Sequence, residues 1–465
     1  MKGDFTRDTF DARHHFSRVL MQQGRVQLDA DWNEQAAILL HYLQTLAADL
    51  IGPHGGPAIN PDGTEHGGFK IGPMGANGFT IGKGRYYVDG ILCENDTDGL
   101  EFRSQQDYPI PRDMPPDGDY LVYLDVWERH LTYVEQEDAD GKVVSIREAA
   151  LSGPDTASRA RIVWQVKVEK DQDNCPDTKT WDILMKKWQP TNRGRLRAWA
   201  KAESTSDDNP CVTPPESRYR GAENQLYRVE IHKRGTAAEG ATFKWSRENG
   251  SVIFPVRKIT GDQVELETLG RDARLGLQEG DWVEIVNDDY ALLNKAEALL
   301  QVFAIDRDHN VVTLLADEKA PPSTVDDVQA KHPYLRRWDQ SEREDNQVNT
   351  FGVPIEEGKD LELEDGVQIQ FQSSTNGPIT YRTGDYWLIP ARTATGDVEW
   401  PGTEDAPEAC EPHGITHHYA PLAIIGVSGG QVGTSVQDCR RPFRALWNLT
   451  PSNSTANHTH PMERL

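Results

Sequence analysis

The strongest hydrophobic pattern in the chain is a stripe of apolar residues near its N-terminus. The stripe consists of Trp32, Ala36, Leu39, Leu43, Leu46 and Leu50. The spacings of four, three, four, three and four residues are those of the a and d positions of a heptad repeat, over almost three heptads. Asp31, with Glu34 three residues later, is typical of an N-cap with a capping box, and Gly52-Pro53 is a helix stop signal. The pattern predicts one amphipathic helix that follows a polar arm.

The apolar stripe has two interpretations. The helix either docks on its own domain or packs against a neighbouring subunit. Fewer than three heptads are marginal as a free coiled coil, so the helix needs some partner surface. The expected contact surface joins three phenylalanines of the arm to the helix stripe: Phe5, Phe10, Phe16, Trp32, Leu39, Leu43, Leu46 and Leu50.

Most of the remaining chain has the pattern of short strands bounded by turns. Residues 119–128 are apolar on both alternating faces, which is typical of a central strand. Asp89-Gly90 and Asn249-Gly250 are hairpin-turn sequences. Seven strand candidates fall within residues 223–320, at the spacing of a small barrel or sandwich. They are Leu226–His232, Ala241–Trp245, Val252–Val256, Gln263–Glu267, Trp282–Val286, Leu299–Ile305 and Val311–Leu315.

These patterns predict a mainly β, multi-domain protein. Small barrel- or sandwich-type β domains follow an N-terminal arm and one amphipathic α-helix. A chain of 465 residues is too long for a single compact core. The expected division is 1–55 arm and helix, 56–210 β domain with a long loop excursion, 211–320 barrel- or sandwich-like domain, 321–350 linker, 351–443 second β unit and 444–465 polar tail.

The net charge of the chain limits the classes of molecule that it is expected to bind. The chain has 49 basic and 74 acidic side chains, a formal net charge of −25, which argues against binding of nucleic acid over the whole surface. Lys186, Lys187, Arg193, Arg195 and Arg197 form one basic cluster, with Trp188 and Trp199 nearby. Basic and aromatic residues together can bind nucleic acid. In so acidic a chain, ion pairs within the protein or between subunits are the expected role of this cluster.

No membrane insertion and no secretory signal are predicted. The chain has no run of 18 apolar residues, and residues 1–10 lack the apolar core of a signal peptide. We therefore expect synthesis in the cytoplasm. Five cysteines without a CxxC motif fit a reducing compartment and mostly free thiols. A bridge between Cys175 and Cys211 is the alternative.

One segment has the residue types and spacing of a soft-metal site. Cys410, His413, His417 and His418 are candidate zinc ligands, and Cys439 or Glu411 is the alternative for the fourth ligand. The competing interpretation is a loop whose histidines bond to the backbone. No cofactor is otherwise expected. Walker, HExxH and GxSxG motifs are absent, so no catalytic residue is assigned and the sequence favours a protein that is not an enzyme.

Residues 1–35, MKGDFTRDTFDARHHFSRVLMQQGRVQLDADWNEQ, resemble the N-terminus of an uncharacterised bacterial family. Its members are associated with extracellular contractile injection systems and phage-tail-like particles. Further matching segments are residues 119–135, 217–232, 241–252, 384–392 and 412–427. The resemblance implies a particle-associated protein whose partners are tube, baseplate or other subunits. It also implies assembly in the cytoplasm and release with the particle.

The function expected from the residues and the resemblance together is structural. The chain is a structural or cargo component of a contractile injection particle that acts through protein–protein contacts, with a homo-oligomer as one option. Two alternatives stay open. One is an enzyme or toxin effector that acts on glycans or peptides, with zinc as its candidate cofactor. The other is a fibre-like adhesin module.

Overall fold

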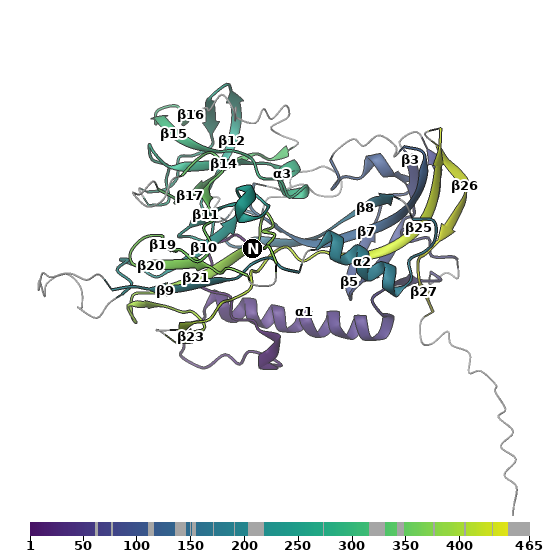
Figure 1. The fold of residues 1–465 in the computed structure, drawn as a ribbon, viewed down its shortest axis with the longest axis horizontal. Coiled ribbons are helices and arrows are strands. Elements are labelled where there is room, and N and C mark those ends of the chain that lie inside the picture. The colour runs from purple at the N-terminus through teal and green to yellow at the C-terminus, as the bar shows by residue number, and fades with distance from the viewer. Residues whose placement is uncertain are drawn as a thin grey trace, which may run out of the picture.

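The computed structural model describes residues 1–60, 64–75, 78–109, 116–134, 146–148, 150, 155–170, 172–189, 191–202, 218–272, 274–315, 331–341, 348–374, 377–403, 406–429 and 431–444. The protein is mainly β, as its sequence predicts, and its strands form several sheets and one closed barrel. Figure 1 shows two β lobes side by side, with one long helix, α1 (Asp29–Ile51), running beneath both. The described helices include none that is both long and apolar enough to cross a membrane.

A closed six-stranded barrel caps the first lobe. Its strand order is β12-β13-β16-β15-β14-β17. Val264, Val283 and Leu335 point into its core and are fully buried. The strands are β12 (Ile253–Thr260), β13 (Gln263–Leu266), β14 (Trp282–Val286), β15 (Leu299–Asp306), β16 (Val311–Leu315) and β17 (Tyr334–Trp338).

All seven strands expected between residues 223 and 320 exist, but they do not form a single unit. The first two, β10 (Gln225–Ile231) and β11 (Thr242–Ser246), belong to a separate sheet, and the barrel is closed instead by β17. This last barrel strand lies inside the expected linker 321–350. Because the sequence on either side of β17 is polar, the prediction missed this short strand, which is buried along its whole length.

Two sheets pack beneath the barrel and complete the first lobe. Their orders are β18-β11-β10-β21-β22 and β19-β20-β9. Fully buried aromatic residues such as Phe243, Phe371 and Trp387 fill the space between them. The strands not yet given are β9 (Leu196–Ala200), β18 (Val353–Pro354), β19 (Asp360–Glu362), β20 (Val367–Phe371), β21 (Tyr386–Arg392) and β22 (Asp397–Val398). A small hairpin, β23 (Gly402–Thr403) with β24 (Ala406–Pro407), lies nearby.

The second lobe is built on a four-stranded sheet, β26-β25-β7-β8. The predicted central strand β7 (Gly118–Leu131) is confirmed, because it pairs with β25 (His418–Ser428) on one side and β8 (Arg159–Lys170) on the other. β26 (Gln431–Asp438) forms the edge. Two small sheets, β27-β1-β4-β5 and β2-β3-β6, close the core on one face. Their strands are β1 (His54–Pro57), β2 (Ile71–Gly75), β3 (Gly78–Ile81), β4 (Gly84–Val88), β5 (Ile91–Asn95), β6 (Leu100–Glu101) and β27 (Pro442–Phe443).

The predicted Asp89-Gly90 hairpin is confirmed, with φ angles of 47° and 79° between the paired strands β4 and β5. The predicted Asn249-Gly250 hairpin is wrong: these residues also form a turn, with φ angles of 51° and 64°, but the strands that they connect, β11 and β12, belong to the five-stranded sheet and to the barrel and do not pair. Positive φ at two successive positions is what Asp-Gly and Asn-Gly pairs supply in two-residue hairpin loops.

A second helix, α2 (Thr178–Trp188), covers the other face of the four-stranded sheet (Figure 1). It lies within the stretch expected to be a long loop excursion. Asp177 caps it by accepting a hydrogen bond from the Thr180 backbone N–H at 2.7 Å. Trp181, Leu184, Met185 and Trp188 form its apolar face. A short helix, α3 (Asp288–Leu292), follows β14, and 3₁₀ turns occupy Ala12–His14, Phe102–Ser104 and Ala237–Glu239.

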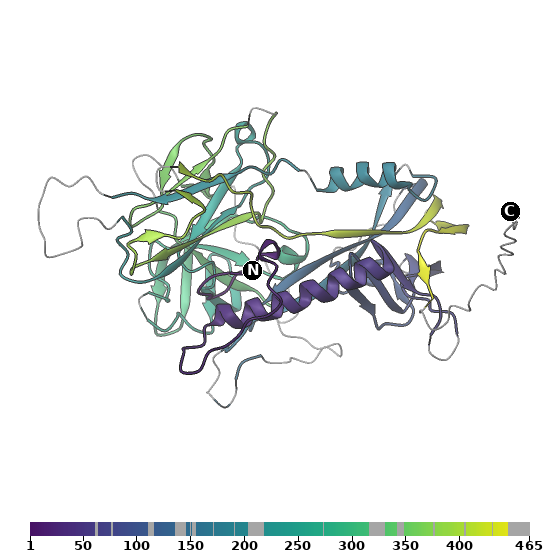
Figure 2. The ribbon, with the colours of Figure 1, turned by 90° about the horizontal axis from the view of Figure 1, so that it is seen from below.

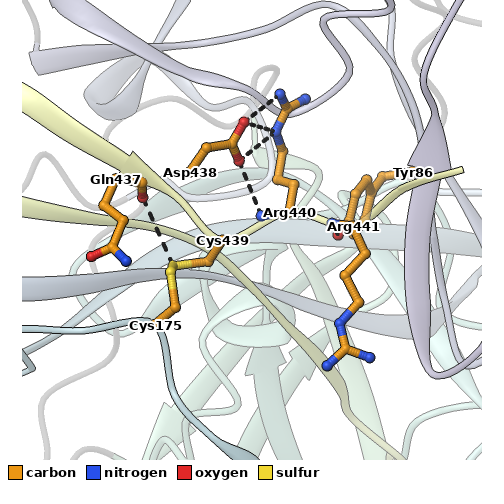
Figure 3. The surroundings of a disulfide bond; sticks show 7 residues. All are labelled: Tyr86, Cys175, Gln437, Asp438, Cys439, Arg440 and Arg441. Atoms are coloured by element: carbon orange, nitrogen blue, oxygen red, sulfur yellow. Dashed lines mark hydrogen bonds and ion pairs between the residues drawn. A yellow bond between two sulfur atoms is a disulfide. The ribbon is translucent and has the colours of Figure 1, made fainter.

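A disulfide joins the segment before α2 to the end of β26 (Figure 3). Cys175 pairs with Cys439 across a separation of 264 residues. The expectation of a free Cys175, and its alternative pairing with Cys211, are therefore wrong. The fold places Cys175 beside Cys439 because α2 packs over the sheet that ends in β26. Cys93 and Cys410 are free thiols as expected, and Cys211 lies outside the described residues.

Candidate partner-binding surface

The N-terminal arm, residues 1–28, is anchored in the first lobe. Lys2 Nζ lies 2.9 Å from Glu230 Oε1, and the Asn249 side-chain amide donates to the Gly3 carbonyl at 2.9 Å. Arg228 donates to the Met1 carbonyl at 3.1 Å. Asn249 is therefore both a turn residue and a clamp for the arm. The beginning of the arm is thus part of the fold.

The anchor point belongs to a buried ionic cluster between the five-stranded sheet and the barrel. We call Lys2, Arg228, Glu230, Lys244 and Glu284 the junction cluster. Lys244 Nζ lies 2.7 Å from both carboxylate oxygens of Glu284, and each side chain is 1% exposed. Arg228 Nε lies 2.6 Å from Glu230 Oε2. These ion pairs join β10 and β11 of the sheet to β14 of the barrel.

The charges of the junction cluster stabilise one another. Burial alone raises the pKa of Glu284, but the surrounding positive charges, with that of Lys244 the largest, together outweigh burial and hold this pKa at about 2. Burial likewise raises the pKa of Glu230, and the positive charges of Lys2, Arg228 and Lys244 bring it well below its ordinary value. Burial lowers the pKa of Lys2 to about 7. The cluster is closed and internally paired, so its role is to hold sheet, barrel and arm together.

Further along, the arm contacts the first half of α1. Thr6 donates to the carboxylate of Asp29 through its backbone N–H at 2.9 Å and its hydroxyl at 2.6 Å. The Thr9 hydroxyl donates to Glu34 at 2.7 Å. Although burial opposes it, these hydrogen bonds from Thr6 lower the pKa of Asp29. The helix begins at Asp29, two residues before the expected N-cap Asp31, and Glu34 binds the arm instead of completing a capping box.

The helix docks on its own chain mainly through small residues. Ala30 and Ile38 are 1% exposed, and Ala37, Ala47 and Ala48 are half-buried. The β4–β5 turn comes so close that a Cβ atom on Gly90 would lie 2.0 Å from the Gln44 carbonyl oxygen. The backbone of α1 therefore rests directly on the domain.

The large apolar side chains of the predicted stripe point to solvent. We call these five residues the α1 face. Their exposed fractions are 77% for Trp32, 54% for Leu39, 65% for Leu43, 57% for Leu46 and 67% for Leu50. The interpretation that the stripe docks on its own domain is therefore wrong for this chain. Figure 2 shows α1 on the outside of the molecule, with the N-terminal arm beside its first half.

The apolar surface is wider than the sequence pattern indicates. Leu40 and Tyr42 flank the α1 face and are also exposed. In the arm, Phe16 is exposed as expected, and the sequence reasoning missed four further exposed residues, Leu20, Met21, Val26 and Leu28. Their clustering before the helix was the available signal.

Two of the predicted contact residues serve the fold instead. Phe5 packs edge-on against His130, with ring centroids 6.3 Å apart, and Phe10 packs against His41 of α1 at 5.8 Å. Both phenylalanines are half-buried. They position the arm on β7 and α1, and Phe16 alone of the three belongs to the exposed surface.

The α1 face is electrically neutral. Residues 35–48 contain no acidic residue, lysine or arginine, within a chain of net charge −25. Large exposed apolar surfaces that lack charge mark interaction sites on soluble proteins. The arrangement is suited to binding another apolar protein surface and offers no group for bond chemistry.

The four candidate metal ligands have separate contacts. His417 Nδ1 lies 2.7 Å from Asp125 Oδ1, and His418 Nδ1 lies 2.8 Å from Asp89 Oδ2. The His413 ring stacks on Tyr386, and the Cys410 backbone pairs with Leu196 in β9. Across the part of the chain that the structure describes, no group of three or more His, Cys, Asp or Glu residues is arranged to hold a metal ion.

The basic cluster forms ion pairs within the protein. Lys187 pairs with Glu169 at 2.6 Å, Arg193 with Asp385 at 2.8 Å, and Arg195 with Glu411 at 3.0 Å. Trp188 stacks on Tyr123 at 4.1 Å between ring centroids. The expected ion pairs within the protein are confirmed for these three residues.

A protein-family model described as a family of unknown function, DUF6519, matches residues 1–187 and 192–450, which is nearly the whole chain. No curated protein and no solved structure matches.

Proposed function

The chain belongs to the DUF6519 family, whose function is unknown, and we propose that it is a structural or cargo component of a contractile injection particle. It acts there through protein–protein contacts. The exposed α1 face carries this proposal, since it presents a heptad stripe to solvent along a helix already fixed to its domain. The resemblance of residues 1–35 to particle-associated proteins supplies the setting.

The energy available from this surface agrees with a docking role. Complete burial of a Leu or Phe side chain contributes about 1.5–3 kcal/mol. Scaled to their exposed fractions, the five residues of the α1 face contribute roughly 5–10 kcal/mol. Association costs about 4–15 kcal/mol, so the α1 face alone gives weak binding. The neighbouring Leu40, Tyr42 and exposed arm residues are needed for a stable contact.

Particles purified from cells that carry altered copies of the gene test the proposal. In the triple variant, Leu39→Gln, Leu43→Gln and Leu46→Gln remove apolar surface without touching the buried side of α1. We expect an unchanged melting temperature and loss of the protein from the particles, measured by mass spectrometry. A matched control, Phe303→Gln with Leu315→Gln, alters two comparably exposed residues of the barrel and should leave association intact.

The position of the protein in the particle follows from cryo-EM of wild-type and gene-deleted particles. Density lost from the tube lumen identifies cargo, and density lost from the baseplate or exterior identifies a structural part. Absence of wild-type protein from purified particles contradicts the proposal. Equal association of wild-type and triple variant contradicts the role of the α1 face.

A further inference from the structure

The domain covers the side of α1 that a coiled coil leaves in water. With Trp32, Leu39 and Leu46 at d positions and Leu43 and Leu50 at a positions, the domain-facing residues fall mainly at b, c and f, with Ala47 at e. The most deeply buried residues, Ala30 at b and Ile38 at c, are on this side. The a and d seam is the part of a coiled coil that packs on a partner helix. The fold therefore holds α1 with its complete pairing seam outward.

The seam is symmetric about residue 41. In a two-fold antiparallel pair centred there, Trp32 meets Leu50 of the second copy, Ala36 meets Leu46, and Leu39 meets Leu43. Each d position then faces an a position, and every contact occurs twice, as a two-fold interface requires. Along the seam, each small or large side chain faces one of medium size: Ala36 faces Leu46, and Trp32 faces Leu50.

The charges favour the antiparallel orientation. Asp29, Asp31 and Glu34 form an acidic first turn, which an antiparallel pair places far from its own copy. A parallel pair brings these like charges together, which is unfavourable. The only acidic residue near the other end, Asp49, lies opposite the uncharged Gln35 of the second copy. Opposed helix dipoles add to the preference.

The acidity of the whole chain also favours a pair of identical chains. Two copies of net charge −25 repel each other, so self-association needs a contact region without charge. Residues 35–48, which are free of carboxylates, lysines and arginines, provide that region. A neutral apolar seam offers no complementary charge to select a differently charged partner.

From these observations we propose that the occupant of the α1 face is a second copy of this chain, bound as a two-fold antiparallel α1 pair. This inference names the partner of the surface on which the proposed function rests. The dimer is the unit that enters the larger assembly. Exposed arm residues, such as Leu20 and Val26, extend the contact beyond the two helices.

Light scattering coupled to size-exclusion chromatography of the purified full chain, over a hundredfold range of concentration, tests the dimer. We expect a mass twice the 52.2 kDa of one chain, falling to one chain on dilution. The Leu39→Gln, Leu43→Gln, Leu46→Gln variant should be monomeric at every concentration with an unchanged melting temperature. The Phe303→Gln, Leu315→Gln control should dimerise like wild type. A monomeric wild type, or a dimer that the triple variant leaves intact, overturns the inference.

Cysteine crosslinking tests the orientation. A mixture of Ala36→Cys and Leu46→Cys chains should form a disulfide dimer, because the antiparallel pair places these positions side by side. Leu46→Cys alone should not, since its two copies lie about 15 Å apart along the axis. Efficient crosslinking of Leu46→Cys alone overturns the antiparallel arrangement. The unaltered chain serves as the background control for its native thiols.

Different results reject the dimer and the proposed role in the particle. A monomeric chain that still requires the α1 face to enter particles rejects the second copy as occupant and leaves the proposed function standing. A dimer that never associates with particles rejects the proposed function and leaves the antiparallel pair standing.

Discussion

Replacing Lys244 by methionine tests whether the junction cluster stabilises the fold. Methionine keeps an unbranched stem against Trp338, whose ring centroid lies 4.4 Å from Lys244 Nζ. It removes the cation that lies 2.7 Å from both oxygens of Glu284. A buried carboxylate is then left without its closest positive charge.

The magnitude of this change follows from the general cost of breaking a buried ion pair. Removing one partner of such a pair costs about 3–5 kcal/mol. The lowered pKa of Glu284 agrees in direction, because the positive charges around this carboxylate, with that of Lys244 the largest, together outweigh its burial. We therefore expect Lys244→Met to lower the free energy of unfolding by about 3 kcal/mol, a roughly hundredfold change in the unfolding equilibrium.

Urea denaturation, followed by tryptophan fluorescence and far-UV circular dichroism, measures the loss. Lys187→Met is the matched control, because Lys187 is 61% exposed in its pair with Glu169 and should cost less than about 1 kcal/mol. The double change Lys244→Met with Glu284→Gln should recover part of the stability, since it removes the unpaired charge.

The pH dependence has a defined sign. A carboxyl group with a lowered folded pKa stabilises the protein above pH 4.5, and this contribution is lost as the pH falls towards 2. The difference between wild type and Lys244→Met should therefore shrink over that range. If Lys244→Met costs no more than Lys187→Met at pH 7, the reasoning about the junction cluster is refuted.

Three further predictions concern the second lobe and α1. Burial lowers the pKa of His54 from 6.5 to about 4, so the free energy of unfolding should fall by about 3 kcal/mol as the pH drops from 6.5 to 4. His54→Asn should flatten that part of the stability curve. Reduction of the Cys175–Cys439 disulfide should lower the free energy of unfolding by about 2–5 kcal/mol and speed hydrogen exchange in α2 but not in the barrel. Equal hydrogen exchange in α2 of the oxidised and the reduced protein contradicts this prediction. Gly90→Ala should loosen α1, seen as faster proteolysis of the helix, because the new Cβ meets the Gln44 carbonyl oxygen. Gly261→Ala is the control, because Gly261 also has a positive φ but no atom lies within 4 Å of the added Cβ. This change should lower the free energy of unfolding only by the cost of a left-handed backbone, about 1–2 kcal/mol, and leave α1 protected from proteolysis.

Local patterns predicted the elements better than their assembly. Strand β7 is recognisable because both alternating faces are apolar, and the structure buries one face in the core of the second lobe and the other under α2. The barrel strands β12 to β16 were recognisable by the same periodicity. Their closure by β17 depends on pairing with β12 and β14, a long-range contact that no local pattern encodes.

Other features were visible but outweighed by a stronger signal. The apolar positions of α2, at Trp181, Leu184, Met185 and Trp188, have helical spacing, but the poor apolar periodicity and the prolines of residues 169–222 as a whole favoured a long loop excursion. The Cys175–Cys439 bridge was beyond sequence reasoning, because 264 residues separate its ends and their proximity depends on the folded sheet.

The candidate site divides in the same way. The heptad spacing predicted which residues of α1 share a face, and the structure places all five together. Which way that face points depends on packing. Small residues such as Ala30 and Ala37 let the helix backbone approach the β4–β5 turn, so the leucines remain outside. A helix that docks through its large side chains and a helix that exposes them have the same hydrophobic periodicity.

The central claim is that the α1 face is buried against another protein in the working assembly. Hydroxyl-radical footprinting measures this directly, with the particle-bound chain compared with the same chain released and diluted until monomeric. We predict that oxidation of Trp32 and Tyr42, both exposed in the single chain, falls several-fold in the particle, while oxidation of Phe303 on the barrel stays constant. Equal oxidation of Trp32 and Tyr42 in the two states contradicts the claim.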